Sequence, residues 1–231
     1  MKKIVVLSGA GISAESGIQT FRDANGLWEG HDVALVATPE GWKKNPELVL
    51  EFYNQRRRQL LEVSPNEAHK ILVELEKYFD IQIITQNVDD LHERAGSQKV
   101  IHLHGELLKV RSSNNPYFIL DWKTDLKLSD TDKLGHPLRP HIVWFGEEVP
   151  AMQEAIQHTE TADILIVIGT SLQVYPAAGL MHYTKPEIPI FYIDPNPLNS
   201  IKISNPLYII SKKGTEGMAI LKEKLLKEYC T

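Results

Sequence analysis

Cysteine is almost absent from the chain. Cys230 is the only cysteine among 231 residues. A single cysteine excludes an internal disulfide bond and any zinc site built from several cysteines. Such low cysteine use suits a protein of a reducing compartment.

Long hydrophobic runs and an excess of positive charge are missing as well. No apolar run approaches the roughly 20 residues that a membrane-spanning helix needs. Lys and Arg number 25 against 30 Asp and Glu, for a formal net charge of -5, so the chain has no general attraction to nucleic acid or anionic membranes. Residues 1–14 imitate a signal peptide, but only four strongly apolar residues run consecutively before Ser8, which favours a buried strand. We expect a soluble, cytoplasmic protein without nucleic-acid or membrane partners.

Short runs rich in valine and isoleucine recur along the chain. They cover residues 4–7, 81–84, 100–103, 164–168, 190–193 and 207–210. Such runs are typical of parallel strands that are buried on both faces. Helical patterns lie between several of them, at residues 46–61, 66–78, 89–95 and 216–229. The alternation predicts an α/β fold, a Rossmann-like parallel sheet with helices on both faces.

Two stretches interrupt this alternation. Residues 26–61 contain loop and helix without a good strand, and residues 108–139 are polar and irregular. Both look like insertions that together form a smaller lobe. We therefore assign residues 1–28, 77–105 and 142–231 to a large domain, and residues 29–76 and 106–141 to a small domain.

A glycine-rich turn directly follows the first apolar run. Residues 9–14 fit the pattern G-x-G-x-x-G/A, in which glycines let the backbone approach a pyrophosphate and the following helix offers free N–H groups. A tight turn without a ligand explains the same residues. A dehydrogenase would show a strand ending in an acidic residue about 20 positions on. That distance falls here at residues 28–32, inside a loop. Thr20, Phe21, Arg22 and Trp28 suit a loop that closes over a ligand, although aromatic anchoring in a core is comparably consistent.

Polar residues follow four further strands. They are Gln86, Asn87, Asp89 and Asp90 after one strand, His102 and His104 at the next, residues 169–171 after a third, and Asp194 and Asn196 after a fourth. Ligands of parallel sheets bind outside the carboxyl ends of the strands, so this set favours a dinucleotide crevice. For Asp89 and Asp90 a helix N-cap is the alternative, and for Asp90 we prefer it. Each histidine could be a general base, a metal ligand or a hydrogen-bonded core residue.

Five long motifs carry a family resemblance. They are GAGISAESGIQTFRDANGLW at residues 9–28, TQNVDDLHERAG at 85–96, HLHGEL at 102–107, RPHIVWFGE at 139–147 and IGTSLQVYPAAG at 168–179. In these motifs and their order the chain resembles the sirtuins, which are NAD-dependent protein lysine deacylases. The resemblance implies that NAD is consumed as a cosubstrate, and that the products are deacylated lysine, nicotinamide and an O-acyl-ADP-ribose.

The resemblance also implies roles for individual residues. His104 matches the catalytic base, and Asn87 and Asp89 are the other catalytic candidates. The implied NAD site comprises Gly9, Ala10, Gly11, Ile12, Glu15, Thr20, Phe21, Arg22, Trp28, Gln86, Asn87, Val88, Asp89, Gly169, Thr170, Ser171, Asp194, Pro195, Asn196 and Gly214. The implied segment that pairs with the substrate backbone as an added strand contains Val143, Phe145, Gly146 and Glu147.

A pair of side chains suggests the acyl group. Tyr53 and Arg56 lie three apart on a predicted helix, where a guanidinium and a phenol could hold a carboxylate. Without the resemblance, a solvated basic face at residues 56–58 would be the preferred interpretation. With it, the pair is similar to that of sirtuins that accept succinyl and malonyl lysine, and we expect removal of these groups along with acetyl.

The chain departs from most sirtuins at the zinc module. Ser112 stands where the first zinc cysteine usually lies, and His136 and His141 make an unconvincing substitute. We expect no zinc and no other metal, with Tyr117, Phe118, Leu120 and Trp122 supplying apolar packing instead. Asp194 stands where sirtuins more often have asparagine, and a carboxylate still accepts hydrogen bonds from ribose. ADP-ribosyl transfer and a non-catalytic NAD sensor remain alternative functions, and we expect a monomer.

Overall fold

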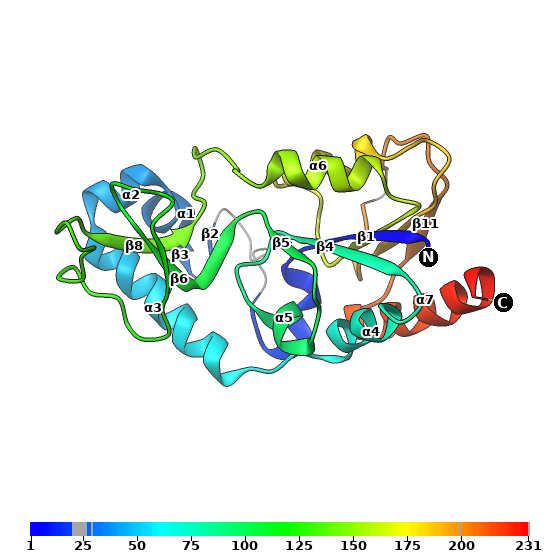
Figure 1. Ribbon diagram of the computed structural model, residues 1–231, viewed down its shortest axis with the longest axis horizontal. Helices are drawn as coiled ribbons and strands as arrows, with labels where there is room; N and C mark the ends of the chain where they lie inside the picture. Colours follow the sequence, from blue (N-terminus) through cyan, green and yellow to red (C-terminus); the bar gives the residue numbers. More distant parts are fainter. Residues whose placement is uncertain (20–26, 29, 199, 231) are drawn as a thin grey trace.

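The structure is a computed structural model that describes residues 1–19, 27, 28, 30–198 and 200–230. The predicted NAD-site residues Thr20, Phe21 and Arg22 lie outside the described residues. The molecule is elongated, with a large sheet toward the end that carries both termini and a small sheet toward the other end (Figure 1). No helix in the described ranges is long and apolar enough to cross a membrane.

The large sheet contains all six predicted strands. They are β1 (Lys3–Ser8), β4 (Asp80–Thr85), β5 (Val100–His102), β9 (Ile164–Ile168), β10 (Ile190–Ile193) and β11 (Leu207–Ile210). The strands are parallel and lie in the order β11-β10-β9-β1-β4-β5. The order runs outward in both directions from the neighbours β1 and β9, so the sheet is doubly wound and its switch point lies between these two strands.

The strands of the large sheet end in one row. Ser8 at the end of β1 is paired with both Thr85 of β4 and Ile168 of β9. Thr85 in turn is paired with His102 of β5, and Ile168 with Ile193 of β10. The residues that follow these strand ends therefore emerge at one edge of the sheet.

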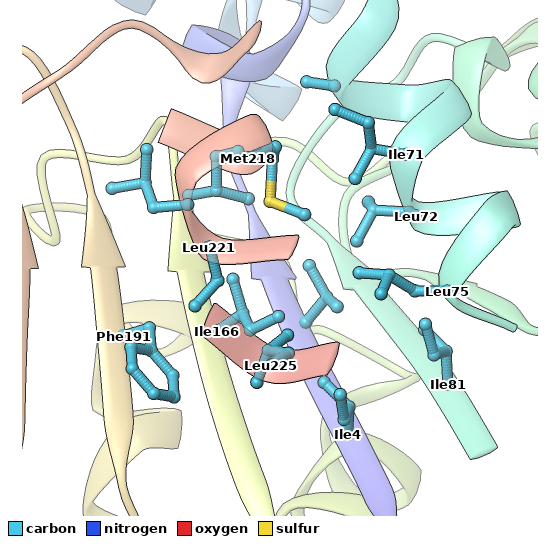
Figure 2. Close-up of a cluster of buried hydrophobic side chains, with 14 of the residues drawn as sticks. Ile4, Ile71, Leu72, Leu75, Ile81, Ile166, Phe191, Met218, Leu221 and Leu225 are labelled. Atoms are coloured by element: carbon cyan, nitrogen blue, oxygen red, sulfur yellow. The ribbon is translucent and has the colours of Figure 1, made fainter. Parts of the chain in front are cut away.

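Helices cover both faces of the large sheet because its strands are apolar on both faces. Helices α4 (Glu67–Leu75) and α7 (Gly214–Tyr229) pack on one face, where Ile4 contacts the same core as Leu72 and Leu221 (Figure 2). Helix α6 (Met152–Glu160) and the 3-10 helix η3 (Ala177–Tyr183) cover the other face, around Val5 and Leu7. Alternate residues of β1 thus enter two cores, as expected of a strand buried on both sides.

The small domain combines three helices with a three-stranded sheet. Its helices are α1 (Val33–Val36), α2 (Pro39–Lys44) and α3 (Pro46–Glu62), and its sheet has the order β7 (Ile119–Asp121), β6 (Gly105–Ser112), β8 (Leu138–Ile142). Side chains of Asp32, Thr38 and Asn45 each accept a backbone N–H at the start of these helices. These caps explain how the three helices can follow one another with only one or two residues between them.

Several sequence expectations for the small domain are wrong. The stretch without a good strand contains a short antiparallel pair, β2 (Leu27–Trp28) and β3 (His31–Asp32). The irregular stretch at 108–139 contains most of β6, all of β7 and the start of β8, which its polar composition concealed. Of the aromatic and apolar residues expected to replace zinc, Phe118 and Trp122 pack on a buried cluster. Tyr117 lies exposed in the turn before β7, and Leu120 is exposed because β7 is an edge strand.

Candidate functional site

The glycine-rich turn lies at the switch point of the sheet. Gly9 N–H donates to the Ile168 carbonyl at 3.0 Å, and Gly11 N–H to the Gly169 carbonyl at 2.8 Å. A Cβ on Gly11 would lie 2.6 Å from Gly169 Cα, and a Cβ on Gly169, whose φ is +64°, would lie 2.3 Å from Ile12 N. Glycine is therefore required here because two backbones touch.

The turn continues differently from the sequence expectation. Instead of an α-helix, residues after Gly9 form two 3-10 turns, η1 (Ala10–Ile12) and η2 (Ala14–Ser16). The N–H groups of Ile12 and Ser13 donate to carbonyls within the first turn. Some N–H groups expected to be free at the start of a following helix are therefore used inside the protein, because a 3-10 turn bonds each N–H to the carbonyl three residues earlier.

The loop after β4 brings Asn87 and Asp89 together beside this turn. Asn87 Nδ2 donates to Ser13 Oγ at 3.1 Å, and Ser13 Oγ donates to Asp89 Oδ2 at 3.0 Å. Asp89 Oδ1 accepts the N–H of Leu91, the first residue of α5 (Leu91–Ala95). Burial raises the pKa of Asp89 to about 6, although these two hydrogen bonds oppose the shift. The two polar side chains are held in fixed places in a buried environment.

The helix cap at α5 differs from the preferred interpretation. Asp90 occupies the N-cap position, but its side chain makes no capping hydrogen bond. It instead forms an ion pair with Arg94, with Oδ1 2.9 Å from Nε. Asp89, one residue earlier, accepts the N–H of Leu91, the first residue of the helix. The carboxylate of Asp89 thus bonds both to the start of α5 and to Ser13 in the glycine-rich turn.

Two histidines bond to consecutive carbonyls of the same loop. His104 Nδ1 lies 3.0 Å from the Gln86 carbonyl, and His102 Nδ1 lies 3.0 Å from the Asn87 carbonyl. Burial lowers the pKa of His104 against the opposing effect of the Gln86 hydrogen bond, so its ring is neutral at pH 7. With the Nδ1 proton used toward Gln86, Nε2 keeps a lone pair, as a general base needs.

The residues predicted for the adenosine side follow β9 and β10. Thr170 Oγ1 accepts from Gln86 Nε2 at 3.1 Å, which links two strand ends. Asp194 is buried and accepts the N–H of Asn196 at 2.8 Å, whereas Pro195 and Asn196 are exposed and Ser171 is half-buried. Carboxylate, amide and hydroxyl groups at one edge are the set that holds ribose and a carboxamide, so the residues present fit NAD.

Four other predicted NAD-site residues have structural surroundings. Both carboxylate oxygens of Glu15 accept from Thr215, through its N–H at 2.9 Å and its hydroxyl at 2.8 Å, and Gly214 is buried beside them at the start of α7. Trp28 packs edge-on against Phe52 with ring centroids 5.0 Å apart. The carbonyl of Val88 accepts the Leu107 N–H at 2.8 Å, which joins the loop to β6.

The predicted substrate-pairing segment follows β8. Val143 N–H donates to the His104 carbonyl and Phe145 N–H to the Ala37 carbonyl, while Phe145 and Gly146 are exposed. The carboxylate of Glu147 is used within the protein. It accepts from Arg139 at 2.7 Å, from Arg111 at 3.1 Å and from Trp144 N–H at 2.8 Å. Glu147 thereby fixes the turn that presents the segment.

Tyr53 and Arg56 are both buried on α3. Tyr53 Oη accepts from Trp144 Nε1 at 3.0 Å, and burial raises the pKa of the phenol. Arg56 lies over the Phe52 ring at 3.6 Å and donates to the Phe52 carbonyl at 2.6 Å. The solvated basic face considered for residues 56–58 is wrong for Arg56 and Arg57, which are buried, and holds only for Arg58.

Hydrogen bonds gather around Ser112, the residue that we expect in place of a zinc cysteine. Ser112 Oγ donates to Asp132 Oδ2 at 2.7 Å and accepts from Asn114 N–H at 3.1 Å. Asp132 Oδ2 also lies 3.1 Å from His136 Nδ1. Within the described ranges no group of three or more His, Cys, Asp or Glu is placed to hold a metal ion.

Sequence reasoning missed several residues of this region. Ser13 links Asn87 to Asp89, and Trp144 holds Tyr53, yet neither was singled out. Arg139 stacks on the Trp144 ring at 3.3 Å while it binds Glu147. The motifs containing Ser13, Arg139 and Trp144 were recognised, so their membership in a motif was the available signal. Their partners lie far away in sequence, which spacing does not reveal.

The fold and this edge define an α/β protein of the nucleotide-binding, doubly wound class. Residues 9–176 match the family model described as Sir2 family. The chain is 58% identical over 227 residues to an NAD-dependent protein deacylase of Helicobacter pylori (strain ATCC 700392 / 26695), covering 98% of this chain and 99% of that protein. It is 53% identical over 232 residues to one of Bacteroides thetaiotaomicron, covering 98% and 99%.

Solved structures agree with this assignment. A crystal structure of a Sir2 homolog–NAD complex superposes with a TM-score of 0.87 at 40% sequence identity, covering 98% of this chain and 90% of that one. The chain belongs to the Sir2 family, the sirtuins.

Proposed function

We propose that this chain is an NAD-dependent protein lysine deacylase. The observation that carries the proposal is the state of His104, a neutral imidazole whose Nδ1 proton is directed to the Gln86 carbonyl at 3.0 Å. The ring lies beside the buried Asn87 and Asp89, at the edge where the strands of the large sheet end. Family membership and the names of the relatives support the same activity.

The residues of this edge have distinct tasks in such a reaction. NAD, when bound, supplies the ribose carbon that takes the acyl oxygen and the nicotinamide that leaves. His104 Nε2 takes a proton from a ribose hydroxyl, which lets that oxygen attack the acyl carbon. Asn87 and Asp89 present polar groups in a buried, water-poor place, which suits stabilisation of developing positive charge. One water is consumed, and the acyl group passes from the lysine nitrogen to ADP-ribose.

The substrate peptide adds as a strand to residues 143–147. The N–H groups of Val143 and Phe145 already donate within the protein, so the peptide bonds to other main-chain groups of this segment. The exposed Phe145 and Gly146 leave the segment accessible. Main-chain recognition of this kind gives affinity with little demand on the peptide sequence.

The acyl groups include succinyl and malonyl besides acetyl. Tyr53 Oη accepts from Trp144, which leaves its own hydroxyl hydrogen to donate, and the raised pKa keeps that hydrogen in place. Arg56 lies close enough for its charge to act on the Tyr53 phenol. A phenol donor beside a guanidinium is suited to a carboxylate at the end of an acyl chain.

Activity is tested with NAD and acetyl, succinyl or malonyl peptides, by measuring nicotinamide and peptide mass. We expect acyl-dependent nicotinamide release and loss of the acyl mass, and a fall of roughly 10²–10⁴-fold in the His104→Ala variant. Absence of acyl-dependent nicotinamide with the unmodified protein would leave a non-catalytic NAD sensor. A peptide or protein that gains the mass of ADP-ribose would indicate ADP-ribosyl transfer instead.

Acyl preference is tested with a Tyr53→Phe, Arg56→Met double variant. Loss of the donors to a carboxylate should lower the ratio of desuccinylation to deacetylation by roughly tenfold or more. The matched control is Arg58→Met, two residues further along the same helix and exposed, which should leave the ratio unchanged. An unchanged ratio in the double variant rejects the acyl assignment while deacylation itself stands.

A further inference from the structure

The two histidines beside β5 have different surroundings. Each directs Nδ1 to a carbonyl of the loop after β4, His102 to Asn87 and His104 to Gln86. His102 alone has a second partner, because its Nε2 lies 2.7 Å from Glu93 Oε1 of α5. For His104 Nε2, no hydrogen-bond partner occurs among the residues that the structure describes. The pair therefore shares one contact and differs in the other.

The geometry fixes the charge of His102. A carbonyl oxygen and an ionised carboxylate only accept hydrogen bonds, so both ring nitrogens must carry a proton for both contacts to be favourable. A neutral ring of either tautomer would place a lone pair against an acceptor, at 2.7 Å or at 3.0 Å. Burial opposes ionisation of Glu93, but its hydrogen bond to His102 lowers its pKa, so the carboxylate is charged. His102 is therefore an imidazolium.

The groups that face His102 agree with this charge. Burial acts to lower its pKa, but the hydrogen bond and charge of Glu93 and the charge of Glu106 on β6 outweigh it and raise the pKa. Asp89, in the loop after β4, also experiences the His102 charge, which favours its ionised form. His92 on α5 is neutral, its pKa lowered first by burial and then by nearby His69 and His102.

Asn87 is held at three points, and His102 provides one of them. Its N–H donates to Thr85 Oγ1 at 3.0 Å, and its side-chain amide donates to Ser13 Oγ at 3.1 Å. Its carbonyl lies 3.0 Å from His102 Nδ1. The first two contacts join Asn87 to β4 and to the glycine-rich turn, whereas the third joins it, through Glu93, to α5.

We propose that His102, charged and anchored by Glu93, is a positioning residue that holds the main chain at Asn87 and so aims the Asn87 amide. For its kinetic consequence the inference rests on the proposed deacylase function. The charge of His102 does not depend on that function and is measured separately.

Nitrogen NMR of histidine-labelled protein measures the charge directly. In the full chain at pH 7.5, the His102 ring should show two protonated nitrogens, with the signal assigned by its loss in a His102→Gln variant. Glu93→Gln should make His102 neutral at the same pH, because burial remains while the carboxylate is gone. A neutral His102 in the unmodified protein overturns the proposal, whatever the enzyme assay shows.

Steady-state kinetics test the positioning. His102→Leu and Glu93→Leu should each lower kcat by roughly tenfold or more, with KM for NAD within about twofold, because the Asn87 amide loses its aim while binding groups remain. Glu93→Gln should keep most of the kcat of the unmodified protein, in contrast to Glu93→Leu. Its side-chain amide can donate to a neutral His102 Nε2, while Nδ1–H still donates to the Asn87 carbonyl. The matched control is Glu154→Leu at an exposed position on α6.

The outcomes separate the two proposals. Equal kcat in Glu93→Leu and the unmodified protein, or a loss carried only by KM, rejects the positioning role. A failure of Glu93→Gln to recover more activity than Glu93→Leu rejects it too, because a merely structural loss would not be rescued. If the unmodified protein releases no acyl-dependent nicotinamide, the deacylase proposal fails while the NMR result still decides the charged pair. Should His102→Leu not fold, the two variants at the partly exposed Glu93 provide the kinetic test.

Discussion

The large and the small sheet are stabilised by different mixtures of contacts. The large sheet lies between two apolar cores, in which residues such as Ile4 and Leu7 are fully buried. The small sheet also packs on apolar clusters, around Trp144 and around Val110, and adds buried polar contacts. The buried Arg57 donates to the Leu107 carbonyl at 3.1 Å and to Asn54 Oδ1 at 2.6 Å. Two further polar groups, around Asp132 and around Glu147, fix the loops of the small domain.

The difference teaches that loops can be fixed by a few polar contacts. Hydrogen bonds are directional, so a few well-placed ones can define a loop that has little apolar surface to bury. The Ser112–Asp132–His136 group joins β6 to the turn before β8 in this way. The following predictions test this contrast, from the largest expected effect to the smallest.

Matched leucine truncations compare the packing of the two sheets directly. Leu72→Ala removes a fully buried side chain from the core beneath β1 and β4, and should lower the free energy of unfolding by about 4 kcal/mol. Leu138→Ala acts on the smaller cluster with Leu50 and Val110 and should cost about 2 kcal/mol. Urea unfolding measures both. Equal costs would mean that the two cores contribute alike, contrary to the contrast drawn here.

Acid should weaken the packing of α4 on the large sheet through the buried His69. Burial, then the charge of Arg94, lower the pKa of His69 to about 4 from the ordinary 6.5, so the stability present above pH 6.5 is lost as pH falls toward 4. Between pH 7 and pH 5 this amounts to about 2 kcal/mol. Urea unfolding of a His69→Leu variant at both pH values should show a smaller difference. The exposed His182→Leu is the control, and an unchanged pH dependence in His69→Leu would contradict the assignment.

Removing one hydroxyl tests the polar group of the small domain. Ser112→Ala takes away the donor to Asp132 and the acceptor of two backbone N–H groups, which should cost about 1 to 2 kcal/mol. Hydrogen exchange should show the loosening at residues 112–136 and not in the large sheet. The exposed Ser113→Ala is the matched control. Uniform loosening of both domains would reject a local role.

A chelator should have no effect. We expect EDTA treatment to leave the melting temperature and activity unchanged, because hydrogen bonds stand where most sirtuins hold zinc. Elemental analysis of the purified protein is the decisive measurement. Stoichiometric zinc would overturn the expectation.

The sequence predicted the strands of the large sheet well for a physical reason. Strands buried on both faces must be apolar throughout, so runs such as residues 164–168 are visible without knowing their neighbours. The strands of the small sheet were not predicted, because β6 alternates buried and partly exposed residues and because β7 is exposed along its length. Edge strands of this kind have the composition of a loop.

For the site, the sequence indicated candidates but not their arrangement. Placement of polar residues after strands correctly predicted that the residues around Asn87 and His104 emerge at one edge, since parallel strands share their carboxyl ends. The alternatives for Asp90 and Arg56 were resolved only in the structure, by the ion pair of Asp90 with Arg94 and by the burial of Arg56. The charge of His102 likewise depends on Glu93 of α5, whose Oε1 lies 2.7 Å from His102 Nε2 in the folded protein.

The backbone contact between Gly11 and Gly169 has a consequence for the order in which the protein is made. The two glycines are separated by more than half of the chain, and β1 lies between β4 and β9 in the finished sheet. While a ribosome is still producing residues before 164, β1 has only one of its two neighbours, and the switch point does not exist. The nucleotide can therefore begin to stabilise the nascent protein only late in synthesis.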